Sequence, residues 1–294
     1  MTDAVSAPAP PGAPTGLAAL LRAFNANKAS WIGLAIVVLV ALAAIFAPLL
    51  APHDPLEQDI LDRLKPPSVD HLLGTDYFGR DTFSRLLYGA RISLVIGIGA
   101  TLIAMVSGTT VGMLAGWRGG RFDAVVMQAM DMLLAFPSLI LGLIIVAMLG
   151  PSMPNIIAAI ALTSLPTFAR IARAPTIAIK GRDFIEACRA LGFTDTRILS
   201  RHILPNIFPE ILVMATLWLA NAIRTEASLA FIGLGLKPPT ATWGGMIREG
   251  FENILDSAWL AIAPGVAILV VVFALNLLGD GLRDAIDPKL RNEA

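Results

Sequence analysis

Apolar residues along this chain gather in six long runs that polar segments separate. The runs cover residues 31–50, 92–116, 124–149, 156–171, 207–236 and 259–278. A bilayer core about 30 Å thick takes about 20 apolar residues of helix to cross. The pattern therefore predicts an all-α polytopic membrane protein with six transmembrane helices. Pro137 lies inside the third run, and Pro166 is expected to kink or break the fourth.

Composition agrees with this prediction. Hydrophobic residues make up 56% of the 294 residues and charged residues 15%, whereas globular chains average about 45–50% and about 25%. The formal net charge is zero, which gives no reason to expect nucleic-acid binding. Residues 1–30, whose first part is rich in Ala, Pro and Gly, are expected to form a flexible tail. A single cysteine, Cys188, excludes an intrachain disulfide.

The distribution of basic residues predicts the orientation in the membrane. Of the 22 Lys and Arg residues, 14 lie on the side of the two termini, 7 lie on the opposite side, and Arg224 lies within the fifth run. Cytoplasmic loops carry the excess of positive charge. We therefore expect both termini, including the tail 279–294, and the basic segment near 170–205 to be cytoplasmic. The segments 51–91 and 237–257 then face outward.

Segment 182–206, between the fourth and fifth runs, predicts two short helices joined by a glycine turn. Asp183 can cap the first helix, and Gly192 can end it because glycine tolerates the left-handed conformation. Thr194 or Asp195 can cap a second helix over 196–204, and Pro205 then starts or bends the next stretch of chain. The apolar face of the first helix would consist of Phe184, Ile185, Cys188 and Leu191. Such a basic hairpin fits either a groove on another protein or the lipid surface.

The same segment resembles the EAA loop of ABC-importer permeases, whose pattern is E-A-A-x3-G-x9-I-x-L-P. Glu186, Ala187, Gly192 and the pair Leu204-Pro205 match it, and Cys188 replaces the second alanine. The stretch HILPN at 202–206 is similar to the form found in the dipeptide, oligopeptide and nickel subfamily. A small cysteine is expected to be tolerated at that position.

Other segments resemble the same subfamily from about residue 30 to 291. They are HLLGTD at 71–76 with GRD at 79–81, SRLLYGAR at 84–91, GWRGG at 116–120 with Asp123, AFP at 135–137, LAFIGLG at 229–235, WG at 243–244 and GDGLRDAIDP at 279–288. The chain is similar to the C-type permease of a peptide importer. This resemblance implies the ABC type I importer permease fold, with a permease core over 92–290 and a cytoplasmic EAA coupling loop over 176–206.

The resemblance also implies partners and a mechanism. A second, homologous permease subunit would complete the path through the inner membrane of a bacterium. Two cytoplasmic ATP-binding subunits would drive transport, and a periplasmic solute-binding protein would deliver the solute. The coupling role would fall on Glu186, Ala187, Cys188, Arg189, Leu191, Gly192, Leu204 and Pro205. A plain helix-ending role for Gly192 stays open as the alternative.

Catalytic chemistry is not expected of this chain. A phosphate-binding loop needs Gly-Lys-Ser/Thr, and none of the five lysines follows a glycine. We therefore expect no bound cofactor, with ATP and Mg²⁺ held by the partner subunits, and no enzymatic activity. The three histidines, His53, His71 and His202, show no metal-ligand spacing, so no metal site is expected. The serines in the apolar runs have no paired His and Asp that would support nucleophilic catalysis.

Three ionisable residues, Asp131, Arg224 and Glu226, lie within apolar runs. Charges in a membrane are costly and usually face a cavity or a partner. They are candidates for a solute path or outer gate, and an interhelical polar clamp is the alternative. The spacing of two between Arg224 and Glu226 places them on different helix faces, so we do not expect them to pair with each other.

The outer segments offer a docking surface for the binding protein, with Asp76, Arg80, Asp81 and Trp243 as candidate contacts. A lid packed on the sister permease is the alternative. Several prolines and two glycines favour a fixed shape for the longer segment.

The expected function is import of di- or oligopeptides, or of a related solute such as a nickel chelate. An ion-coupled secondary transporter is one alternative, but its inverted repeats are missing and intramembrane charges are few. A non-transporting membrane scaffold is another, against which Asp131 and Glu226 weigh.

Overall fold

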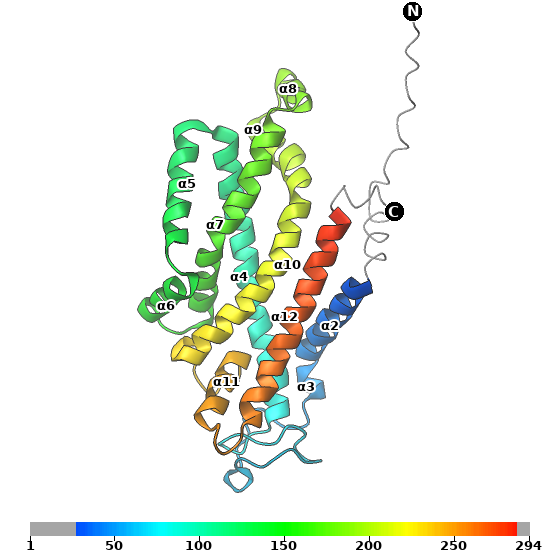
Figure 1. The fold of residues 1–294 in the computed structure, drawn as a ribbon, viewed down its shortest axis with the longest axis vertical. Coiled ribbons are helices and arrows are strands. Elements are labelled where there is room, and N and C mark those ends of the chain that lie inside the picture. The colour runs from blue at the N-terminus through cyan, green and yellow to red at the C-terminus, as the bar shows by residue number, and fades with distance from the viewer. Residues whose placement is uncertain (1–27, 287–294) are drawn as a thin grey trace, which may run out of the picture.

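The computed structural model describes residues 28–286, and Figure 1 shows a bundle of helices whose long axes run roughly alongside one another. The all-α prediction is confirmed. The helices are α2 (Lys28–Ile45), α3 (Ala47–Leu50), η1 (Ile60–Asp62), α4 (Thr82–Arg118), α5 (Gly120–Ala135), α6 (Ser138–Leu149), α7 (Met153–Lys180), α8 (Asp183–Ala190), α9 (Asp195–Ile198), η2 (Leu199–Ile203), α10 (Leu204–Leu229), η3 (Ala230–Leu234), α11 (Trp243–Glu252) and α12 (Trp259–Ile286).

The predicted tails fall largely outside the described residues. Residues 28–30, which the apolar pattern places in the N-terminal tail, belong to α2, and residues 279–286, which it places in the C-terminal tail, belong to α12. Both helices therefore extend further towards the chain ends than the apolar runs indicate.

Five described helices are long and apolar enough to cross a membrane, or six if the bent pair α5 and α6 is one span. The third predicted span is thus a broken one, because α5 and α6 meet at 89°. Proline lacks an N–H and restricts the residue before it, and Phe136, which precedes Pro137, is extended at φ −87° and ψ 135°.

Pro166 is expected to kink or break the fourth span; a break there is wrong, and a kink stays a prediction. Helix α7 runs without interruption from Met153 to Lys180 through both Pro166 and Pro175. Pro137 and Pro166 are both prolines inside an apolar run. Whether the helix continues through each one therefore depends on the packing around it. Helix α7 is held along its length by α4, whereas α5 has no buried residue.

Helix α4 begins ten residues before the predicted second span. Asp81 caps it, and its carboxylate accepts a hydrogen bond from the Ser84 backbone N–H at 2.7 Å. Arg85 and Arg91 interrupt the apolar pattern, and for this reason the pattern does not predict the first turns of α4. The outer segment is therefore residues 51–81, shorter than the predicted 51–91.

Small residues let α4 approach α7 closely. A Cβ added at Gly108 would lie 2.6 Å from the Leu165 carbonyl oxygen and 2.7 Å from the Phe168 Cβ. This is the packing that small residues allow between helices in lipid. Helices α10, α12 and α2 complete the bundle around α4.

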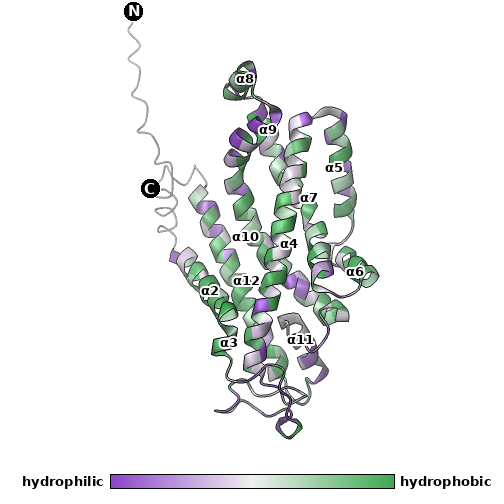
Figure 2. Cartoon of the chain, turned by 180° about the vertical axis from the view of Figure 1, so that it is seen from behind, coloured by the Kyte–Doolittle hydropathy of each residue, from purple (hydrophilic) through white to green (hydrophobic). Residues whose placement is uncertain are grey.

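Different segments lie at the two ends of the bundle. Helix α8 lies at one end, and the outer segment 51–81 lies with α11 at the other; the described chain begins and ends towards the α8 end (Figure 1). Figure 2 shows green, hydrophobic colour along the middle of the helices and purple, polar colour concentrated at the outer segment and near α9. This banding is typical of a bundle that crosses a bilayer.

Candidate functional site

The predicted hairpin at the α8 end consists of one separate helix and the tip of a long one. Helix α8 stands alone, with Arg182 rather than Asp183 at its N-cap position. The second predicted helix is not separate: α9 continues through the π-helical turns of η2 into α10, as one helical stretch from Asp195 to Leu234. A π turn places the Leu204 N–H on the Leu199 carbonyl, which accommodates the ring of Pro205 within a continuing helix.

The glycine turn that joins the two parts is confirmed. Gly192 has φ +77°, and the Phe193 N–H donates to the Cys188 carbonyl at 3.0 Å, as at helix ends with a left-handed residue. Thr194 caps α9 by accepting from the Arg197 N–H. A Cβ added at Gly192 would meet nothing within 4 Å, so the requirement for glycine is conformational and not steric.

One side of α8 packs onto the bundle. Ile185 and Cys188 are buried in the same apolar cluster as Trp117, Ile198 and Ile203. The Cys188 sulfur lies 3.8 Å from His202 Nε2. Cys188 therefore helps to pack α8 against the bundle, and it does not belong to the exposed face of this helix.

The other side of α8 is open. Glu186, Ala187 and Arg189 are exposed, and so are two large apolar side chains, Phe184 at 40% and Leu191 at 74%. The four residues of the predicted apolar face are therefore divided: Ile185 and Cys188 pack on the bundle, whereas Phe184 and Leu191 are exposed. Their exposure gives α8 an outward face that combines a carboxylate with apolar surface, which is the composition of a protein contact.

The sequence does not reveal which residues α8 packs against. Trp117, at the end of α4, is buried; the Lys180 ammonium bonds to its carbonyl, and the Arg189 guanidinium lies 4.6 Å from its ring centroid. The only signal was the position of Trp117 in the GWRGG turn. Of the remaining predicted coupling residues, Leu204 is half-buried against the same cluster and Pro205 is exposed.

The ionisable residues of the apolar runs contact other polar groups. Asp131 on α5 pairs with Arg170 on α7, and both side chains are more than half exposed. Arg224 donates to Asn221 of its own helix at 2.6 Å. Glu226 is buried and accepts from Ser93 of α4 at 3.2 Å. Asp131 and Glu226 thus form interhelical ties, Arg224 does not pair with Glu226, and a role in the solute path stays a prediction.

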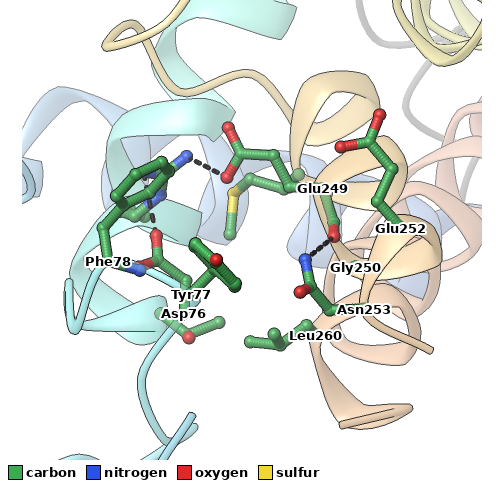
Figure 3. A pocket seen from close by; sticks show the side chains of 11 residues that line it. Asp76, Tyr77, Phe78, Glu249, Gly250, Glu252, Asn253 and Leu260 are labelled. Carbon is green, nitrogen blue, oxygen red and sulfur yellow. Dashed lines mark hydrogen bonds and ion pairs between the residues drawn. The ribbon is translucent and has the colours of Figure 1, made fainter. Parts of the chain in front are cut away.

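At the outer end, four charged side chains form one network, in which Asp76, Arg80 and Arg85 are buried and Glu249 is partly exposed. Asp76 Oδ2 contacts Arg80 Nε at 2.7 Å and Arg85 Nη1 at 3.0 Å. Glu249 of α11 completes it, since its Oε2 lies 3.1 Å from Arg80 and 2.8 Å from Arg85. Figure 3 shows Asp76 and Glu249 among the residues that line the pocket between the outer segment, α11 and the start of α12. Two guanidinium groups and two carboxylates meet there, and burial raises the pKa of Glu249 to about 7.

The four candidate contacts for a binding protein are therefore internal. Asp76, Arg80, Asp81 and Trp243 are each at most 6% exposed, and the Trp243 indole N–H donates to the Leu86 carbonyl at 3.1 Å. They fix the shape of the outer segment and α11, and they are not available as surface contacts in this structure. Docking of a binding protein on this surface stays a prediction, to be assigned to other side chains.

Electrostatics elsewhere in the outer segment follow from local hydrogen bonds. The Lys65 ammonium bonds to the Asp62 carboxylate and holds the pKa of Asp62 below its usual value. Asp62 therefore stays ionised near neutral pH.

Comparison with known proteins agrees with this architecture. The family described as "Binding-protein-dependent transport system inner membrane component" matches residues 108–292, and the N-terminal TM domain of oligopeptide transport permease C matches residues 17–67. Together these two matches cover most of the chain.

Curated relatives span nearly the full length. The dipeptide transport system permease protein DppC of Alkalihalophilus pseudofirmus is 41% identical, over 99% of this chain and 97% of its own. The di/tripeptide permease DppC of Pseudomonas aeruginosa is 42% identical, over 96% and 95%. The glutathione permease GsiD of Pectobacterium atrosepticum is 44% identical, over 88% and 86%.

A solved structure has a similar fold. A chain of the inward-facing methionine ABC transporter MetNI superposes with a TM-score of 0.57 at 21% identity, over 70% of this chain and 98% of that one. This likeness confirms the fold of an ABC importer permease. A secondary transporter and a scaffold, the two alternatives, do not agree with the family match. The chain belongs to the family of inner membrane components of binding-protein-dependent transport systems.

Proposed function

We propose that this chain is the permease subunit of an ATP-driven importer of di- or oligopeptides, coupled to its ATPase partners through α8. The outward face of α8 carries the proposal: Glu186 with Phe184 and Leu191 stands free of the bundle while the back of the helix is anchored. Peptide-transport names among relatives at about 40% identity support the solute class.

The backbone connections of α8 are suited to transmit a displacement of this helix to α10. Buried Ile185 and Cys188 tie α8 to the ends of α4 and α7, and only the short turn around Gly192 separates it from the helical stretch Asp195–Leu234. A displacement of α8 would therefore move α10. At the far part of α10, Glu226 contacts Ser93 of α4, so the same motion would reach the outer half of the bundle.

The proposal includes the partners that the chain itself does not supply. ATP and Mg²⁺ would be bound by two cytoplasmic subunits, a second permease would complete the path, and a periplasmic binding protein would deliver the peptide. The α8 end and both termini would face the cytoplasm. The outer segment would face the binding protein with surface residues other than the four buried ones.

The test is a charge reversal on the open face of α8. Glu186 is exposed and has no role in packing within the chain, so Glu186→Lys should leave membrane insertion and folding of this subunit unchanged. Uptake of a labelled dipeptide by proteoliposomes that contain the complete complex should fall at least tenfold relative to ATP hydrolysis. Such a fall is what the loss of a charge-assisted contact worth about 1.5–3 kcal/mol would produce.

Glu252→Lys is the matched control, since Glu252 is an exposed glutamate at the other end of the bundle. It should leave uptake per ATP hydrolysed unchanged. Normal coupling in the Glu186→Lys complex would contradict the assignment of α8. ATPase activity of the purified chain without any partner would contradict the permease role as a whole.

A further inference from the structure

Three potential metal ligands meet at the outer end, separate from the charged network of Asp76 and Glu249. His53 follows α3, His71 lies in the turns of the outer segment, and Asp81 caps α4. One nitrogen or oxygen atom of each lies within 4.8 Å of those of the other two. Their sequence positions show no metal-ligand spacing, because the folding of the outer segment creates the cluster.

Each of the three groups is held by its surroundings. The His53 backbone N–H donates to Ser84 Oγ at 3.2 Å, and the His71 backbone N–H donates to Ser68 Oγ at 3.0 Å. Asp81 uses Oδ2 to accept from the Ser84 N–H and hydroxyl, both at 2.7 Å. Its other oxygen, Oδ1, is left facing the two imidazoles.

The distances suit a small dication. Asp81 Oδ1 lies 3.0 Å from His71 Nδ1 and 3.9 Å from His53 Nδ1. Bonds of about 2.0–2.2 Å to Zn²⁺ in a tetrahedral arrangement place neighbouring ligand atoms roughly 3.4 Å apart. These two separations lie on either side of that value, and the ligand atoms of all three residues lie within 4.8 Å of one another.

His53 provides an independent observation. Among the described residues its Nδ1 has no hydrogen-bond partner, although the atom is shielded from solvent. A buried polar atom without a partner is costly and calls for an explanation. A cation between Nδ1 and Asp81 Oδ1 would supply the missing partner.

His71 has the second contact that is typical of a metal-binding histidine. Its Nε2 lies 3.4 Å from Asp62 Oδ2, and metal-bound histidines commonly donate this second N–H to a carboxylate. In the tautomer with the proton on Nε2, the Nδ1 lone pair faces the cluster; in the other tautomer, Nδ1 donates to Asp81 Oδ1 at 3.0 Å. Three further carboxylates, Asp54, Glu57 and Asp59, line the same pocket and would attract a cation to it.

We propose that His53, His71 and Asp81 bind one transition-metal dication of the Zn²⁺ class, with water in the fourth position. Two imidazole nitrogens favour such an ion over Ca²⁺ or Mg²⁺, which take oxygen ligands. The ion joins the start of the outer segment at His53 to its end at Asp81, and so clamps the segment against α4. This site is independent of the transport proposal and concerns only the outer end of the chain.

The test uses the full-length chain in its transporter complex, purified without a polyhistidine tag and stripped with a chelator. Equilibrium dialysis against Zn²⁺ with elemental analysis should give about one ion per copy of this chain. His53→Gln removes a ligand without breaking any hydrogen bond of Nδ1, and it should weaken binding by more than about 100-fold. Asp62→Asn should weaken it by about 10- to 100-fold, as loss of a supporting carboxylate does.

His202→Gln is the matched control, because His202 lies at the α8 end of the bundle. It should leave Zn²⁺ binding unchanged. X-ray absorption of the wild-type complex, which depends on no variant, should show two imidazoles per zinc. Three outcomes would each overturn the proposal. They are equal zinc binding by wild type and His53→Gln, no zinc bound by the wild type after equilibrium dialysis against Zn²⁺, and fewer than two imidazoles among the zinc ligands.

Discussion

The outer end and the α8 end of this bundle use charged motif residues in opposite ways. At the outer end, Asp76, Arg80 and Arg85 are buried and paired with Glu249 of a distant helix. At the α8 end, Glu186 and Arg189 are exposed. One end is therefore built as a fixed shape, and the other presents side chains that are available to a partner. A recognisable motif does not by itself tell which of these two uses its residues have.

The first prediction tests whether the two ends face opposite sides of the membrane, and it expects an all-or-none effect. Cys188 is buried, so Cys188→Ala gives a background for single cysteines. Asp195→Cys should react with a membrane-impermeant thiol reagent only from the cytoplasm, and Asp62→Cys only from outside, because basic residues accumulate at the α8 end. Labelling from the reverse sides in oriented vesicles would overturn the topology.

The second prediction weakens the fixed end. Arg85→Met removes a cation that contacts both Asp76 and Glu249. We expect a loss of about 3 kcal/mol in unfolding free energy, the lower end of the range for breaking a buried ion pair, because Arg80 still contacts both carboxylates. Denaturant unfolding in detergent measures this change.

Arg248→Met is its matched control, since Arg248 forms an exposed pair with Glu252 at the same end. Exposed pairs contribute about 0–1 kcal/mol, so this variant should be close to wild type. Equal losses in the two variants would mean that the charged network does not hold the outer end together.

The third prediction concerns the turn at the α8 end and expects the smallest effect. Gly192→Ala places an L side chain at φ +77°, at a cost of about 1–2 kcal/mol, while Gly192→Asn should cost less because asparagine tolerates this region. Gly181→Ala is the control, because Gly181 has φ −88° and also has open space at its Cβ. The three variants are compared by thermal unfolding and by uptake per ATP hydrolysed. An alanine at 192 as stable and as well coupled as an alanine at 181 would contradict the conformational role of this glycine.

Local signals in the sequence predict what local forces decide. The spans follow from the length of apolar helix that a bilayer needs, and Gly192 and Thr194 can be identified because turn and cap chemistry depends on a few neighbouring residues. The ends of α4 and α12 are misplaced by the apolar pattern because charged residues within a helix look like loop.

Contacts between distant residues lie beyond the sequence. Arg85 and Glu249 are 164 positions apart, and nothing near either residue indicates the other. His53 and His71 likewise meet only because the outer segment folds back on itself. The different outcomes at Pro137 and Pro166 have the same origin, since packing against α4 decides which helix stays whole.

The helical stretch that continues from Asp195 through α10 to Leu229 also sets a strict rule for changes in chain length. Each residue of an α-helix advances the chain by about 100° of rotation. One extra residue between 207 and 220 would swing Glu226 away from Ser93 while leaving the α8 face untouched. The number of residues in this helix is therefore as constrained as its side chains are. The loop before α11 should tolerate insertions better, because an extra residue there does not rotate a helix face.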